Sequence, residues 1–256
     1  MKILRRYPES MVIKGEDYRF EKILKDDFFS VNVLYRNQAG RRYVLKLSDF
    51  RFILGLLFRP FAMLMSGHEY TIYRMVDGLP GVPELGPRWG LRGYFHEFIE
   101  GKTLHELGKD AKLPDDFFDR LGELIRAIHE RRIFYMDLNK QGNIILGDDG
   151  KPWLIDYQIC MHFKGGGLFG RWSDRIFKRL IQEDIYHLYK HKKRLQPQRL
   201  TDDEARLAVR SEGAKKYNRF LGAPYRRFKR KLYPSGSNEI IWYKWKKIKD
   251  QSKRMP

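Results

Sequence analysis

Polar side chains that suit phosphate and metal chemistry follow apolar segments in the middle of this 256-residue chain. Asp137 follows the apolar residues 133–136, and Asp156 follows 153–155. Both segments should be buried, and a carboxylate at the end of a buried segment needs a hydrogen-bond partner or a metal. Capping of a turn is the alternative role for each. Asn143, 13 residues before Asp156, adds an amide oxygen to two carboxylates, and Mg²⁺ prefers such oxygen ligands. The occurrence of these three oxygen-bearing side chains together therefore favours a metal site.

The elements that would position these groups divide the chain into a strand-rich part and a helical part. Residues 18–24, 30–35 and 43–47 are rich in β-branched and aromatic side chains, which predicts a meander of three strands with a turn at 37–40. A helix is predicted over 68–76, followed by a strand at 94–99. The residues up to about 100 are thus expected to form a small, mostly β lobe.

The second part begins with an amphipathic pattern. Its apolar residues recur at helical spacing and predict one buried helical face: Phe117, Leu121, Leu124, Ile125 and Ile128. Residues 144–146 and 153–155 flank the turn 147–150 and predict a hairpin. Residues 174–194 and 201–221 are expected to be helical. The fold class that results is α+β.

Five features occur in one order along residues 18 to about 190: a strand Lys, a helix Glu, a segment at 97–101, the segment 137–143 and the segment 156–158. In this order they resemble the protein-kinase-like superfamily. The resemblance implies a bilobal fold, with a small β-rich N-lobe at 1–100 and a larger helical C-lobe at 101–222. A basic, aromatic extension at 223–256 would follow.

The resemblance also implies a role for each residue in phosphoryl transfer from ATP, where positioning and electrostatic stabilisation do most of the work. Lys46 would bind the α- and β-phosphates and be held by Glu69. Asn143 and Asp156 would hold Mg²⁺, and Asp137 would orient or accept the proton of the acceptor hydroxyl. The backbone of Glu97 to Ile99 would meet the adenine edge. His129 is expected to pack in the lower lobe rather than act as a base.

Several departures from the superfamily pattern distinguish this chain from regulated eukaryotic protein kinases. The loop 25–30 contains no glycine, Asn143 lies six residues after Asp137, and Met136 stands where regulated eukaryotic kinases have Arg. Only about 28 residues separate Asp156 from Asp184, too few for a long activation segment. With these features the chain resembles two groups of compact kinases. One group is the lipopolysaccharide core kinases, which act on heptose and Kdo sugars, and the other is the atypical RIO-like kinases. A RIO-like protein Ser/Thr kinase and a pseudokinase binding module for RNA or membrane remain alternatives.

Composition limits the other classes of protein. The chain carries 51 Lys plus Arg against 32 Asp plus Glu, a net charge of +19, and 42% of its residues are hydrophobic, so most of it should fold. Its single cysteine, Cys160, excludes a disulfide-stapled domain, and no export signal is visible, which favours the cytoplasm. Residues 50–65 are apolar at 12 of 16 positions but include Arg51 and Arg59 and are shorter than a spanning helix. They are expected to lie on a membrane surface if they contact one.

The positive charge is concentrated at the end of the sequence. Residues 213–256 hold 14 lysines and arginines and only two acids, Glu239 and Asp250. Aromatic residues alternate with these cations, a composition that suits an anionic membrane surface and also nucleic acid. A solvated tail is the third interpretation. The expected partners are therefore ATP, a hydroxyl acceptor such as a lipid-linked sugar, and an anionic lipid surface at the inner membrane, with nucleic acid as the alternative.

Overall fold

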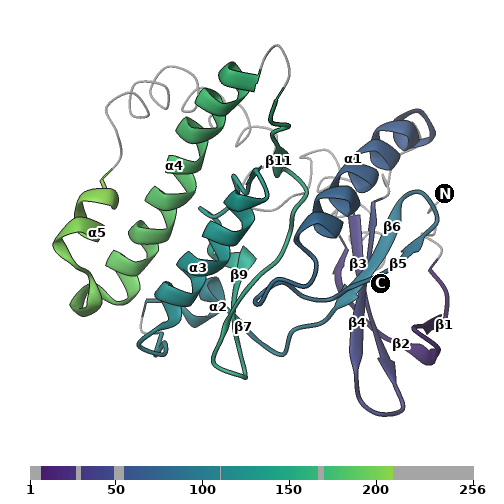
Figure 1. The fold of residues 1–256 in the computed structure, drawn as a ribbon. Helices are drawn as coiled ribbons and strands as arrows, with labels where there is room; N and C mark the ends of the chain where they lie inside the picture. Colours follow the sequence, from purple (N-terminus) through teal and green to yellow (C-terminus); the bar gives the residue numbers. More distant parts are fainter. Residues whose placement is uncertain (1–6, 27–29, 49–54, 110, 167–169, 210–256) are drawn as a thin grey trace, which may run out of the picture.

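The computed structural model describes residues 7–26, 30–48, 55–109, 111–166 and 170–209, with the side chains of its first helix from residue 59 onward. Strands gather in the first part of the chain and helices in the second (Figure 1). The strands are β1 (Ser10–Ile13), β2 (Glu16–Asp26), β3 (Ser30–Asn37), β4 (Arg42–Ser48), β5 (Leu85–Trp89), β6 (Gly93–Glu97), β7 (Gly101–Thr103), β8 (Ile133–Phe134), β9 (Ile144–Gly147), β10 (Pro152–Leu154) and β11 (Met161–His162). The helices are α1 (Gly55–Val76), α2 (Leu104–Leu107), α3 (Phe117–Glu130), α4 (Gly170–Leu195) and α5 (Asp202–Leu207), with short 3-10 turns at Gln141–Asn143 and Pro197–Arg199.

The main sheet is antiparallel and has the strand order β1-β2-β3-β4-β6-β5. Its centre confirms the predicted meander, with the turn between β3 and β4 closed by a hydrogen bond from Gly40 N–H to Asn37 O. Strands β1 and β5 were not predicted. Strand β5 contains Gly86 and Pro87, which are typical of turns, but it lies at the sheet edge, where a proline removes no ladder hydrogen bond that the sheet needs.

Helix α1 packs against β4 and β6 and is longer than predicted (Figure 1). It begins at Gly55, so it includes much of the apolar segment that was expected to lie on a membrane, while residues 50–54 fall outside the described part. Ala62 and Val76 are buried, whereas Phe61 and Leu64 are exposed. Among the described residues, no helix combines the length and apolar character needed to cross a bilayer.

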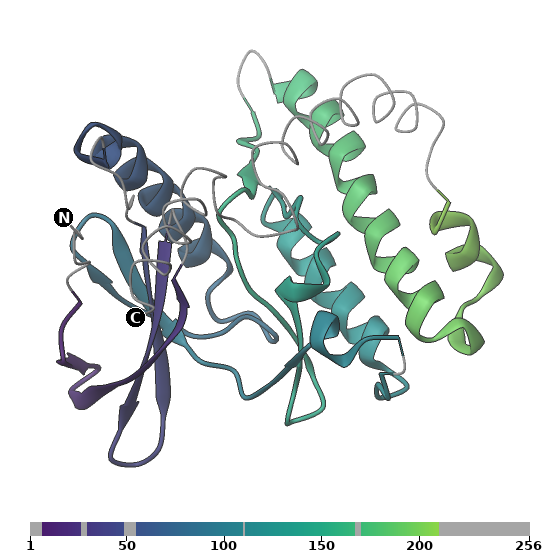
Figure 2. The ribbon, with the colours of Figure 1, turned by 180° about the vertical axis from the view of Figure 1, so that it is seen from behind.

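The helical part is built around α3, whose five predicted apolar residues are all buried. Helix α4 lies beside α3, and the predicted hairpin is present as β9 and β10 (Figures 1 and 2). The end of α1, through Ile72, Tyr73 and Val76, belongs to the same hydrophobic cluster as α3. The α+β class is thus confirmed. Helix α5 covers the start of the segment predicted helical at 201–221, while residues 210–256, with the basic extension, lie outside the described part.

Candidate active site

Lys46 of β4 is the centre of a buried charged network. Its Nζ lies 2.6 Å from Glu69 Oε1 on α1 and 2.8 Å from Asp156 Oδ1, which follows β10. The ion pair between Lys46 and Glu69 predicted from the resemblance is therefore present, although 23 residues separate the two. Tyr94 of β6 lies opposite Lys46 in the sheet register and shares a side-chain hydrogen bond with Glu69. Sequence reasoning gave Tyr94 no role.

The electrostatics of this network keep Lys46 and Asp156 charged, whereas burial raises the pKa of Glu69 although Lys46 opposes the increase. Burial by itself would lower the pKa of Lys46, but the Asp156 and Glu69 carboxylates outweigh burial and raise it. Burial would likewise raise the pKa of Asp156, but the Lys46 ammonium outweighs burial and lowers it to about 2. Lys25, near the end of β2, lowers the Asp156 pKa further. The result is a carboxylate that stays ionised and available to a cation at neutral pH.

Asp137 forms a second cluster on the loop after β8. Asn143 Nδ2 donates to Asp137 Oδ2 over 3.1 Å, and Lys140 Nζ lies 2.5 Å from the same oxygen. Burial raises the pKa of Asp137, while Lys140 and Asn143 oppose the increase. Both donors converge on Oδ2, and neither of them bonds Oδ1. Nothing in the sequence indicated this role, because a lone lysine in a loop is usually an ordinary surface residue. The Lys140 side chain is indeed 58% exposed.

Asp184 of α4 holds the backbone just before Asp137. Its two carboxylate oxygens accept from Tyr135 N–H over 2.9 Å and from Met136 N–H over 3.0 Å. His129 Nε2 lies 3.0 Å from Asp184 Oδ2, which confirms the expected packing role of this histidine. A fully buried carboxylate with three partners thus fixes the start of the loop that carries Asp137.

Two residues of this region adopt left-handed backbone conformations that non-glycine residues seldom occupy. Met136 and Asp156 each have φ of 68°. Such conformations cost about 1–3 kcal/mol and persist where the surroundings hold them. Ile155 N–H donates to Asn143 O over 3.0 Å, and the Tyr135 hydroxyl donates to Ile155 O. The backbone beside Asp156 is therefore bonded to residues on both sides of the loop that carries Asp137. Asn143 and Asp156 are brought into one neighbourhood in this way.

The predicted adenine-binding segment lies at the end of β6. The Glu97 N–H donates to Glu84 O, just before β5, and the Phe98 N–H donates to Arg42 O of β4. Glu97 O accepts from His96 Nδ1 over 2.8 Å. Burial lowers the pKa of His96 to about 4, so its ring is neutral at pH 7. Within the described residues, no ion pair or hydrogen bond joins Glu97 or Ile99 to the Lys46 network.

The sequence-predicted residues therefore form two clusters and one separate segment. Lys46, Glu69 and Asp156 form the first cluster, and Asp137 with Asn143 forms the second. No group of three or more His, Cys, Asp or Glu side chains able to hold a metal occurs in the described ranges. A cation here would need an amide or phosphate oxygen besides the carboxylate of Asp156. The glycine-free loop at 25–30 includes residues 27–29, which lie outside those ranges.

Comparison with known proteins gives distant, partial matches. No family model matches the chain. It is 28% identical over 82 residues to a 3-deoxy-D-manno-octulosonic acid kinase of Photobacterium profundum. Similar kinases of Vibrio cholerae and Vibrio parahaemolyticus are 24% identical over 84 residues and 26% identical over 81 residues. These stretches cover 32–33% of this chain and 32–35% of the relatives, so the chain spans about a third of their length.

The matches relate part of this chain to sugar-acid kinases. They support the lipopolysaccharide-kinase side of the resemblance, since Kdo is 3-deoxy-D-manno-octulosonic acid. The resemblance to RIO-like kinases stays a prediction.

Proposed function

We propose that this chain is a kinase with a bilobal protein-kinase-like fold, which uses ATP and Mg²⁺ to phosphorylate a hydroxyl group. The N-lobe would comprise residues 1–100, the C-lobe 101–222 and the extension 223–256. The observation that carries the proposal is the position of Lys46 between Glu69 and Asp156. A strand lysine, a helix carboxylate and a carboxylate from the helical part meet there, as phosphate binding beside a metal requires.

Each residue has a distinct proposed role. Lys46 would contact the α- and β-phosphates, with Glu69 orienting it. Asn143 and Asp156 fit Mg²⁺ because both offer hard oxygen atoms, and Asn143 Nδ2 is already bonded to Asp137, which leaves its Oδ1 for a cation. When bound, Mg²⁺ would neutralise charge on the phosphate oxygens. Asp137 would take the hydroxyl proton at Oδ1.

The adenine-binding segment and the substrate that receives the phosphate are proposed on different grounds. The adenine edge would meet Glu97 O and Ile99 N–H, a role carried by the resemblance. The acceptor would be a lipopolysaccharide core sugar or another membrane-associated hydroxyl compound, which is supported by the three sugar-acid kinases that match part of the chain. A pseudokinase remains the second candidate because residues 25–30 contain no glycine to bring backbone amides close to phosphates.

Calorimetric titration with MgATP tests the separation of roles. Asp156→Ala should abolish Mg²⁺-dependent ATP binding, whereas Asp137→Ala should bind MgATP normally but transfer no phosphate to Kdo-containing lipid. Asp148→Ala, which removes an exposed carboxylate nearby in sequence, is the matched control and should behave as wild type. Wild-type affinity in Asp156→Ala would refute the metal assignment. The unaltered protein could also bind MgATP but transfer phosphate to neither sugar nor protein acceptors. That result would favour the pseudokinase.

A further inference from the structure

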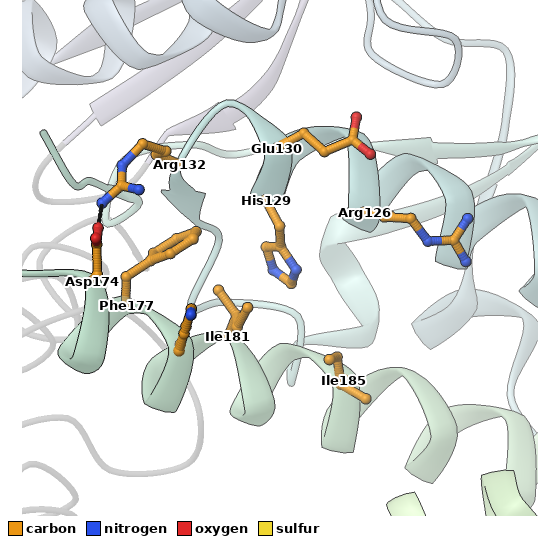
Figure 3. A pocket seen from close by; sticks show the side chains of 9 residues that line it. Arg126, His129, Glu130, Arg132, Asp174, Phe177, Ile181 and Ile185 are labelled. Atoms are coloured by element: carbon orange, nitrogen blue, oxygen red, sulfur yellow. Dashed lines mark hydrogen bonds and ion pairs between the residues drawn. The ribbon is translucent and has the colours of Figure 1, made fainter. Parts of the chain in front are cut away.

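A separate cavity of about 440 Å³ lies between α3 and α4 (Figure 3). Its lining shares no residue with the Lys46 and Asp137 clusters. Figure 3 shows His129 pointing from α3 toward α4, with Phe177 and Ile181 pointing back from α4. The lining residues are Arg126, His129, Glu130, Arg132, Asp174, Phe177, Lys178, Ile181 and Ile185.

The cavity combines an apolar wall with charged side chains of both signs, and two of its cations are free to meet an anion beside the exposed carboxylate of Glu130. The charge of Arg132 is already neutralised by its ion pair with Asp174. Arg126 and Lys178 are exposed, and neither forms an ion pair with another described residue. Ile181 and Ile185 supply aliphatic surface beside them. A ligand that matches this lining has a negative group attached to an apolar body.

The surface around the cavity has the composition of a membrane-contacting face. Trp172, two residues before the lining begins on α4, is 65% exposed, and Arg175 and Arg179 are exposed on the same helix. Exposed aromatic residues beside cations favour the interface of an anionic bilayer. Both ribbon views place the first turns of α1 and α4 at the same end of the molecule (Figures 1 and 2), and α1 exposes Phe61 at 55% and Leu64 at 72%.

We propose that the α3–α4 cavity binds the phosphate headgroup of an anionic membrane lipid, with Arg126 and Lys178 on the phosphate and the isoleucines against the adjoining glycerol and acyl carbons. The chain's own basic segment is a poor occupant, because residues 213–256 carry 14 cations against two acids and would be repelled. RNA fits less well, because Phe177 is 7% exposed and offers little ring surface for base stacking. The proposal goes beyond the kinase function and holds whether or not the chain transfers phosphate.

The site also touches the support of the catalytic loop. His129 lines the cavity and is hydrogen-bonded to Asp184, which in turn accepts from Met136 N–H. A lipid in the cavity would therefore lie against the histidine that braces the Asp137 loop.

Sedimentation of the full chain with vesicles tests the proposal. The vesicles are phosphatidylcholine, with and without phosphatidylglycerol, at low and high salt. Each cation near an anionic surface contributes about a fivefold change in affinity, so the double variant Arg126→Gln/Lys178→Gln should bind about 30-fold more weakly. The matched control removes two exposed cations elsewhere, Lys102→Gln on β7 and Arg206→Gln on α5, and should bind as wild type.

Trp172→Ala should lose the part of the binding that resists salt, because an indole at the interface contributes apolar contact rather than charge. Circular dichroism confirms that each variant folds. Equal losses in the cavity variant and the control would mean diffuse attraction and overturn the proposal. Unchanged vesicle binding by the cavity variant, or no vesicle binding together with tight binding of RNA, would overturn it as well.

Discussion

Replacing Lys46 with methionine removes the cation that lies between two carboxylates. The Lys46 side chain is 11% exposed and that of Glu69 is 1% exposed, so the change leaves Glu69 buried with its charge unpaired. Breaking a buried pair in this way costs about 3–5 kcal/mol, which is the expected decrease in the free energy of unfolding. The double variant Lys46→Met/Glu69→Gln should be more stable than Lys46→Met by about 1–3 kcal/mol, because a neutral amide replaces the stranded charge and can still bond Tyr94.

Urea unfolding followed by circular dichroism measures these differences. The deficit of Lys46→Met should be smaller at pH 5 than at pH 7. Burial already raises the pKa of Glu69 above its unfolded value even though Lys46 opposes the increase, and removing the cation raises this pKa further. The stable neutral form therefore dominates at low pH and is lost as the pH rises through the raised pKa. Lys102→Met, at an exposed lysine, should change stability by less than about 0.5 kcal/mol. A double variant whose loss equals the sum of the two single losses would refute the coupling.

Three further outcomes follow from the same structure. Lys140→Ala should reduce kcat by about tenfold and move the acidic limb of the kcat–pH profile to higher pH, because Lys140 opposes the raised pKa of Asp137. Gly101→Ala should lower stability by about 2–4 kcal/mol in urea, since φ is +149° and a Cβ would meet Leu146 O at 2.2 Å, whereas Gly67→Ala on α1 should not destabilise. As pH falls from about 4 to 2, Asp156 should lose about 1–2 kcal/mol of stabilisation, because its folded pKa is depressed, and Asp156→Asn should remove this slope.

The sequence predicted the elements whose pattern is local. The α3 stripe and the β9–β10 hairpin depend on periodicity and turn residues, and both are present. The start of α1 was missed because Pro60 and Arg59 interrupt its apolar pattern, yet the helix continues through them. The pairing of Lys46 with Glu69 came from the order of motifs in a known superfamily, since periodicity contains no information about contacts 23 residues apart.

The site residues whose roles the sequence did not reveal were missed for one physical reason. Tyr94 reaches Glu69 only because sheet register places it opposite Lys46 while α1 packs over the same strands. Asp184 was noticed as a helix residue, but its bonds to the backbone before Asp137 span 48 and 49 residues. Such roles depend on how elements dock, which no window along the chain reveals.

The attachment of Asp184 to α4 limits which insertions and deletions this protein can tolerate. Each added residue turns an α-helix by about 100°, so one insertion between Phe177 and Asp184 cannot leave both side chains facing α3 and β8. A change in length ahead of Gly170 leaves the spacing within the helix intact. Length variation among natural relatives of this protein should therefore be tolerated before α4 and excluded from its first half.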